Sequence, residues 1–354
     1  MVTDLDDADA FRRLDPEDML RCIRELPQQC RDAWAYSAEF ALPPRYRYPK
    51  DVVVLGMGGS AIGGSVLSDA VRNCCPVPVL VNRDYTLPAF VDQQTLAIAC
   101  SYSGDTEETL CAFEDALARQ SMVAVISGGG ALSKRAVDLG IPLWPIRYVS
   151  QPRAALGYFV IPLLSILHKS ELIPDPGTDF ADAVAEMEAL QSKIDASVPT
   201  AANPAKQLAL KLHGRVPIIY GAEHLTAAAR RWKGQLNENA KSWSFFEVIP
   251  ELNHNSVAGY RGPDWVQDKF IVIGFASDLF SPRNQVRLQV TQEMLAEFGV
   301  PCVSLKARGK SILAQILSTI YFGDYVSYYL AMLYGVHPSP VDNITALKKR
   351  LRAS

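Results

Sequence analysis

The stretch that decides the fold is residues 95–109, with the sequence TLAIACSYSGDTEET. Its first six residues form a largely apolar run, which predicts a strand buried on both faces of a parallel sheet. A helical pattern begins at Thr106, so the polar residues between form a strand-to-helix turn. Three hydroxyl side chains, Ser101, Ser103 and Thr106, therefore lie where the free N–H groups and positive end of a helix gather. Such a turn is suited to bind a small anion, for example the phosphate of a compact metabolite.

Ordinary helix capping is the alternative explanation of these hydroxyl groups. Asp105 and Glu108 have the spacing of a capping box, which would satisfy the helix without any of the hydroxyls. Capping needs one side chain, however, and here several cluster beside Gly104, which lets the backbone approach a ligand. We therefore favour anion binding over capping.

The strand–turn–helix pattern recurs along the chain. Further strands are predicted at residues 51–55, 77–81, 122–127, 141–146, 216–221, 270–276 and 300–305. Helical patterns separate them, at residues 106–119, 132–139, 154–169, 180–194, 225–241 and 282–298. This alternation predicts an α/β fold with two similar halves, each built on a parallel sheet.

The linker between the halves is predicted at residues 195–204, a run of small residues with two prolines. The chain then divides into an N-terminal helical arm (residues 1–46), a first domain (47–195) and a second domain (204–354). A core helix is predicted over residues 312–333 and a short closing helix over 343–351.

The composition excludes several classes of protein. With 354 residues, 49% hydrophobic and 21% charged, the chain is long and apolar enough to bury a sizeable core. A formal net charge of -3 gives no reason to expect nucleic acid or a membrane surface as partner. No apolar run approaches the roughly 18 residues of a spanning helix. The 7 cysteines are scattered and odd in number, which favours a reducing, cytoplasmic location over a disulfide framework.

A second glycine-rich turn, GMGGSAIGG at residues 56–64, follows the predicted strand 51–55. It contains Gly-x-Gly-x-x-Ala, a degenerate dinucleotide fingerprint, and Asp84 comes late for a ribose-binding acid. A tight turn that merely lets the helix approach the strand is an equally simple explanation. Ser60 shifts the balance toward phosphate, because it is a second hydroxyl at a second helix start in the same half.

Candidate acid–base groups are few. None of the 5 histidines forms a metal pair at helical spacing, so we expect no metal site. His254 lies in a polar loop that follows a predicted strand, where α/β proteins place reactive groups. Glu238 lies between two amides near a helix end, and composition alone would make it a surface glutamate.

Six segments together resemble the bifunctional phosphoglucose/phosphomannose isomerases of the sugar isomerase (SIS) domain group. In chain order they are GMGGS (56–60), SYSGDT (101–106), PRAAL (152–156), NENAK (237–241), ELNHN (251–255) and LKK (347–349). They occur in the family's order and span nearly the whole chain. The resemblance implies two SIS-type domains in tandem, each a doubly wound, flavodoxin-like parallel sheet. It also implies reversible isomerisation of glucose 6-phosphate, and of mannose 6-phosphate, to fructose 6-phosphate in glycolysis and gluconeogenesis.

The family's site residues transfer to this chain position by position. Its phosphate-binding residues fall on Gly59, Ser60, Ser101, Ser103 and Thr106. Its catalytic residues fall on Glu238, His254, Arg153 and Lys348, with Lys349 as the neighbouring alternative for the lysine. A family threonine associated with acceptance of both C2 epimers has a possible counterpart in Ser339. The resemblance further implies a homodimer in which the histidine comes from the partner subunit.

The chemistry of these residue types suits that reaction. A carboxylate, Glu238, would move the proton between C2 and C1 through a cis-enediol. Arg153 would stabilise the enediolate, because a guanidinium keeps its charge, and His254 with Lys348 would open the sugar ring. The reaction involves no net redox change with a partner molecule, so we expect no cofactor.

Three other functions stay open at this point. A non-catalytic SIS regulator would bind a hexose phosphate without turnover, although no basic helix-turn-helix pattern is visible. A nicotinamide oxidoreductase would depend on the turn at residues 56–61 alone. An isomerase of another phosphosugar, such as an amino sugar, would share the same site.

Overall fold

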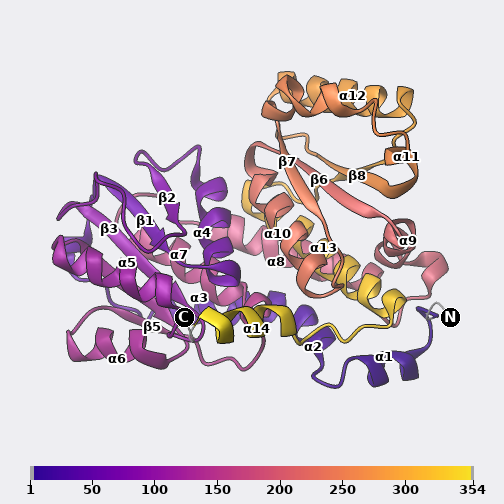
Figure 1. The fold of residues 1–354 in the computed structure, drawn as a ribbon. Helices are drawn as coiled ribbons and strands as arrows, with labels where there is room; N and C mark the ends of the chain where they lie inside the picture. The colour runs from indigo at the N-terminus through magenta and orange to yellow at the C-terminus, as the bar shows by residue number, and fades with distance from the viewer. Residues whose placement is uncertain (1–3, 352–354) are drawn as a thin grey trace.

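The computed structural model describes residues 4–351 and contains two parallel sheets that lie side by side (Figure 1). Sheet A has the strand order β2-β1-β3-β4-β5, and sheet B has the order β7-β6-β8-β9. In both sheets the first strand of the half lies between the second and the third, as in doubly wound, flavodoxin-like folds. The predicted α/β class and the two parallel-sheet halves are confirmed.

Sheet A is the scaffold of the first half. Its strands are β1 (Asp51–Leu55), β2 (Val79–Asn82), β3 (Thr95–Ser101), β4 (Met122–Ser127) and β5 (Leu143–Pro145). The helices around it are α4 (Gly58–Val71), α5 (Glu107–Ala118), α6 (Gly130–Asp138) and α7 (Gly157–Lys169). Every residue of β1 and β3 is buried, because these strands are covered on both faces. Their carboxyl ends therefore lie next to each other at one edge of the sheet.

Sheet B repeats this arrangement in the second half. Its strands are β6 (Val216–Ala222), β7 (Phe245–Ile249), β8 (Phe270–Ala276) and β9 (Cys302–Lys306). Its helices are α9 (Pro204–Leu212), α10 (Thr226–Glu238), α11 (Val266–Lys269) and α12 (Pro282–Glu297). All three strand pairs are parallel. Helix α10 runs back from the carboxyl end of β6. Its last residue, Glu238, therefore lies at the side of sheet B where the amino ends of the strands are found.

Three groups of helices join or flank the halves. The central helix α13 (Ile312–Tyr334) is buried along almost its whole length and packs against α8 (Gly177–Ile194), α9 and α10. The N-terminal arm consists of α1 (Ala8–Leu14), α2 (Met19–Arg24) and α3 (Leu26–Tyr36), of which α2 contacts α13 and α3 contacts α7. The last helix, α14 (Asp342–Leu351), has no buried residue and extends toward the first half, yellow in Figure 1. Within residues 4–351, no helix combines the length and apolarity needed to cross a membrane.

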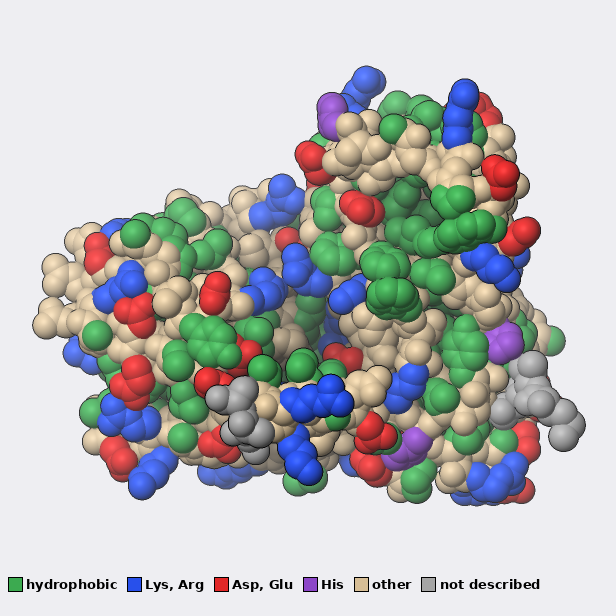
Figure 2. Space-filling view, viewed as in Figure 1, with side chains coloured by type: hydrophobic (Ala, Val, Ile, Leu, Met, Phe, Trp, Pro, Cys, Tyr) green, Lys and Arg blue, Asp and Glu red, His purple; other side chains and the backbone are tan. Residues whose placement is uncertain are grey.

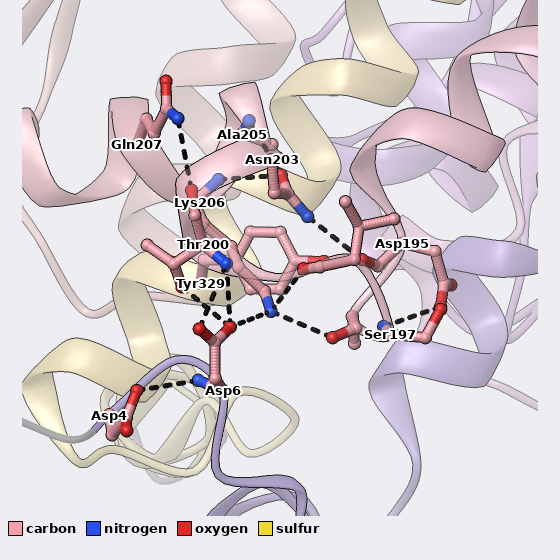
Figure 3. Close-up of polar contacts among 12 residues, drawn as sticks. Asp4, Asp6, Asp195, Ser197, Thr200, Asn203, Ala205, Lys206, Gln207 and Tyr329 are labelled. Carbon is pink, nitrogen blue, oxygen red and sulfur yellow. Dashed lines mark hydrogen bonds and ion pairs between the residues drawn. The ribbon is translucent and has the colours of Figure 1, made fainter.

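The predicted linker, residues 195–204, is ordered by the N-terminal arm. Lys206 is fully buried, and its Nζ donates to a carboxylate oxygen of Asp6 and to the carbonyl oxygens of Ala196 and Val198, each at 2.9 Å (Figure 3). Asp6 also accepts from the backbone N–H of Thr200 at 2.9 Å. The arm thus holds the connection between the sheets, and α8, which directly precedes this connection, packs on α13. The exact domain boundaries stay a prediction.

Candidate active site

The site begins at the adjacent carboxyl ends of β1 and β3. Helix α4 follows the glycine turn with Met57 as its N-cap residue, and α5 follows the hydroxyl turn with Thr106 as its N-cap residue. Neither helix has a side chain that caps its first turn. Both helix starts therefore present free backbone N–H groups and positive dipole ends at the same edge of sheet A.

The hydroxyl side chains of the two turns are brought together. The backbone N–H of Tyr102 donates to Ser60 Oγ at 3.2 Å, which links the glycine turn to the hydroxyl turn. Ser101 Oγ donates to Thr106 Oγ1 at 3.1 Å and accepts from the N–H of Gly104 at 3.0 Å. Ser103 is exposed at the rim of the turn, where its Oγ accepts from the N–H of Asp105. All four hydroxyls thus belong to one polar patch.

The capping-box explanation of this turn is wrong. Asp105 Oδ1 accepts from the backbone N–H of Ala131 at 2.9 Å, so this carboxylate serves the start of α6 and not that of α5. The cause is the packing of the β4–α6 turn against the β3–α5 turn, which local sequence spacing does not reveal. The N–H groups in the first turn of α5 consequently lack a side-chain cap.

Arg153 lies in a short 3-10 helix, η2 (Pro152–Ala154), that packs directly on the glycine turn. A Cβ atom at Gly59 would lie 2.9 Å from the Cα of Arg153, so only glycine permits this approach. Burial lowers the pKa of Arg153, and the carboxylate of Glu238 opposes that effect. Its guanidinium keeps its charge all the same, because arginine deprotonates only far above physiological pH.

The guanidinium of Arg153 is held by acceptors from distant parts of the chain. Nε donates to Asn239 Oδ1 at 2.7 Å, and Nη2 donates to the carbonyl oxygens of Pro338 and Ser339 at 2.7 and 2.8 Å. The remaining nitrogen, Nη1, lies 3.6 Å from Glu238 Oε2. Three of the five donors are therefore used to orient the group, and the other two face Glu238.

Glu238 lines a cavity between the two halves. Its side chain is 29% exposed, and the cavity, of about 280 Å³, is also lined by Gly58, Gly59 and Arg153. The packing of α10 against α4 brings this residue from the second half to the first. Figure 2 shows Lys and Arg side chains gathered at the hollow between the halves. A carboxylate of the second half and the glycine turn of the first half thus share one cleft.

Several supporting residues were not found from the sequence. Lys241 Nζ donates to the carbonyl oxygens of Glu238 and Pro338 at 2.6 and 3.0 Å, and burial, with the charge of Arg153, lowers its pKa to about 8. The one sequence feature that could have pointed to Lys241 is its position at the end of the NENAK segment (237–241). Arg231 donates to the carbonyl oxygen of Arg153 at 2.9 Å and to the carboxylate of Asp324 at 2.7 Å, and both side chains of this ion pair are buried. No local pattern marks Arg231 or Asp324, because their partners are distant in sequence.

His254 does not join this cleft within one chain. It is exposed at the end of the 3-10 helix η5 (Glu251–His254), which follows β7. Glu238 precedes β7, whose five residues span about 17 Å, so the two side chains lie at opposite edges of sheet B. Lys348 and Lys349 are exposed in the last turn of α14 and do not line the Glu238 cavity. Ser339 is buried, with its carbonyl oxygen on Arg153.

No metal site is found in the part of the chain that the structure describes. No group of three or more His, Cys, Asp or Glu side chains within residues 4–351 could hold a metal ion. The lining of the cleft itself presents one carboxylate, several cationic side chains and the start of α4.

Comparisons with known proteins agree with this architecture. A family model described as the bacterial phospho-glucose isomerase C-terminal SIS domain matches residues 201–351. A bifunctional phosphoglucose/phosphomannose isomerase of Caldicellulosiruptor bescii is 40% identical over 334 residues, which is 94% of this chain and 98% of the relative. One of Aquifex aeolicus is 35% identical over 304 residues, 86% of this chain and 91% of the relative. The crystal structure of a hypothetical protein from Thermus thermophilus shares the fold, with a TM-score of 0.76 at 19% identity over 98% of this chain and 94% of the other.

Proposed function

The chain belongs to the family of bifunctional phosphoglucose/phosphomannose isomerases, and we propose that it interconverts glucose 6-phosphate and mannose 6-phosphate with fructose 6-phosphate. The observation that carries the proposal is the shared cleft: the carboxylate of Glu238 and the glycine turn beside Arg153 line the same cavity. The phosphate would bind at the edge of sheet A, on Gly59, Ser60, Ser101, Ser103 and Thr106. Binding energy from this non-reacting group would hold the reacting carbons beside Glu238.

The central step is a proton transfer between neighbouring carbons. Glu238 takes the proton from C2 of the open-chain aldose and returns it to C1, while the O2 proton moves to O1, so the sugar passes through a cis-enediol. The developing negative charge on the enediolate oxygen faces the two free donors of Arg153, which are already oriented by the bonds of Nε and Nη2. The aldose and the ketose have the same atoms and the same overall oxidation level, so these proton transfers require no cofactor.

Ring opening must come first, and we assign it to His254 with Lys348. The exposure of His254 and its distance from Glu238 support a site shared between two copies, in which the partner's loop covers the cleft. We therefore propose a homodimer as the active species. Sedimentation of the active enzyme should give twice the chain mass, and full activity of a monomer would contradict this assignment.

The proposed general base is tested with Glu238→Gln. Removing the base should lower kcat by at least about a hundredfold with either aldose, measured as fructose 6-phosphate formed. Glu297→Gln is the matched control, because Glu297 is also the last residue of a helix but is exposed on α12. Equal loss in both variants, or normal turnover by Glu238→Gln, would contradict the mechanism. A wild-type chain that binds hexose phosphate without turnover would instead favour the regulator.

We also propose that the protein acts in the cytoplasm. The support is that the 7 cysteines, all within residues 4–351, are free thiols. Fractionation of the source cells with an antibody would test this.

A further inference from the structure

Three cations on the wall of the Glu238 cavity have no part in the isomerisation. Arg83 follows β2, and Arg230 and Lys233 lie one turn apart on α10. Within residues 4–351, none of the three forms an ion pair with a carboxylate. Together with Arg153 and Arg231, they leave Glu238 as the single carboxylate among the lining residues of this cavity. The far end of the cavity therefore carries a surplus of positive charge.

The two arginines are held in place by neutral partners. Arg83 Nη2 donates to Ser65 Oγ at 2.5 Å, and the guanidinium of Arg230 lies 4.9 Å from the ring centre of Phe246. Burial lowers the pKa of Arg83, and the nearby charge of Arg230 lowers it further. Like charges held close together, with hydrogen-bond donors still free, favour the binding of an anion between them.

Neighbouring carboxyl groups do not neutralise this surplus. The charge of Arg230 favours the ionised form of Asp69 on α4, but burial outweighs this effect and raises the pKa of Asp69 to about 7, and its Oδ2 accepts from the backbone N–H of Ala227. Glu238 lies eight residues beyond Arg230, about 12 Å along α10, beside Arg153. An anionic ligand would thus meet a positive site that the protein itself does not fill.

This positive group is separate from the proposed phosphate site. Arg83 is bound at Ser65, five residues after Ser60, which is about 7 Å along α4. Strand β2 leads to Arg83 and β3 leads to the hydroxyl turn at Ser101, Ser103 and Thr106; because both strands flank β1, their ends are about 10 Å apart. One phosphoryl group cannot occupy both places, and a six-carbon chain with a phosphoryl group at each end has a comparable span.

We propose that Arg83, Arg230 and Lys233 form a second anion subsite, which binds the second phosphoryl group of a hexose bisphosphate. The inference rests on the proposed function, because it takes the first phosphoryl group to bind at the hydroxyl groups of Ser60, Ser101, Ser103 and Thr106. A bisphosphate bound in this way fills the cleft and competes with the substrate. Hexose bisphosphates are therefore inhibitors that regulate the isomerase.

Calorimetric titration of the full chain at constant ionic strength tests the subsite. Fructose 1,6-bisphosphate should bind the wild type at least about tenfold more tightly than fructose 6-phosphate. In the double variant Arg83→Gln/Arg230→Gln this ratio should fall to about one. Arg72→Gln, at the C-cap of α4 and outside the cavity lining, is the matched control, and it should keep the wild-type ratio.

Equal affinities in the wild type, or a preference that survives the double variant, would overturn the proposal. If circular dichroism shows that the double variant is unfolded, Lys233→Gln replaces it, and a reduction of the ratio by less than about threefold would also overturn the subsite. Failure of the proposed function has a different signature. A wild type that prefers the bisphosphate at least about tenfold but shows no turnover supports the subsite and contradicts the isomerase. A wild type that turns over its substrate but binds both ligands equally supports the isomerase and contradicts the subsite.

Discussion

Arg153 and Lys206 are both buried cations, and they differ in how completely their donors are matched. Lys206 has three acceptors at 2.9 Å for the three N–H groups of its ammonium (Figure 3). Arg153 is matched at Nε and Nη2, whereas Nη1 faces Glu238 at the cavity. A buried charge whose donors are all matched stabilises the fold, and one that keeps donors directed at a cleft is available for chemistry. Burial alone does not separate the two cases.

The largest expected effect comes from Arg153→Lys. A lysine keeps the charge but lacks the planar fork that bonds Asn239, Pro338 and Ser339 while facing Glu238. We expect kcat/KM for fructose 6-phosphate to fall by at least about a hundredfold, or about 2.7 kcal/mol. Arg215→Lys is the control, because Arg215 is only partly buried and does not line the Glu238 cavity. If Arg153→Lys kept its activity within about threefold, the free donors of Arg153 would have no catalytic value and the comparison would fail.

Lys206→Met should show the opposite pattern. Its removal leaves the carboxylate of Asp6 and two carbonyl groups without their donor, so the free energy of unfolding should fall by about 2 kcal/mol in urea denaturation. The activity at 25 °C should stay within about threefold of the wild type, because Lys206 does not line the cleft. Lys211→Met, an exposed lysine on the same helix, should change neither quantity. A large loss of kcat with unchanged stability would contradict the structural role.

Asp69 is a buried acid whose hydrogen-bonding capacity, like that of Arg153, is only partly used. Its carboxyl accepts one backbone N–H, from Ala227 of α10, and burial raises its pKa to about 7 from its ordinary value near 4. Between these two values the folded state binds more protons than the unfolded state, so stability should fall as the pH rises, and level off above pH 7.

The effect of Asp69 should be small, roughly 1 kcal/mol between pH 6 and pH 7.5. Asp69→Asn keeps an oxygen that can accept from Ala227 but removes the titration, so it should flatten this part of the stability curve. Urea denaturation at several pH values measures the difference. A variant curve with the same slope as the wild type would show that another group titrates.

Much of the fold could be predicted because its signals are local. The predicted strands 51–55, 122–127 and 270–276 match β1, β4 and β8 to the residue, since continuous apolar runs end abruptly at polar turns. The ends of the other predicted strands differ from the structure by at most two residues. The strand predicted at residues 77–81, for example, is β2 (Val79–Asn82), in which Asn82 still pairs with Leu55 of β1. Helix α9 was not predicted, because its nine residues follow the proline-containing stretch that suggested a linker.

Only part of the candidate site could be predicted from local sequence patterns. The hydroxyl and glycine turns could be placed at helix starts, because a strand followed by a helix determines where backbone N–H groups are free. Glu238 and Arg153 came from resemblance, and by local pattern Glu238 was an ordinary surface glutamate. Their pairing depends on Arg231, Asn239 and Ser339, which local sequence patterns cannot connect.

By itself, then, the sequence determined the alternation of strands and helices and the two polar turns, because periodicity and turn chemistry act over a few neighbouring residues. Only the tertiary structure decided that α10 packs on α4, that Gly59 admits the backbone of Arg153, and that Glu238 faces the resulting cleft while His254 lies at the other edge of sheet B. The physical reason is that such contacts join segments 86 to 186 residues apart, whose meeting depends on how two whole sheets and the buried helix α13 pack together.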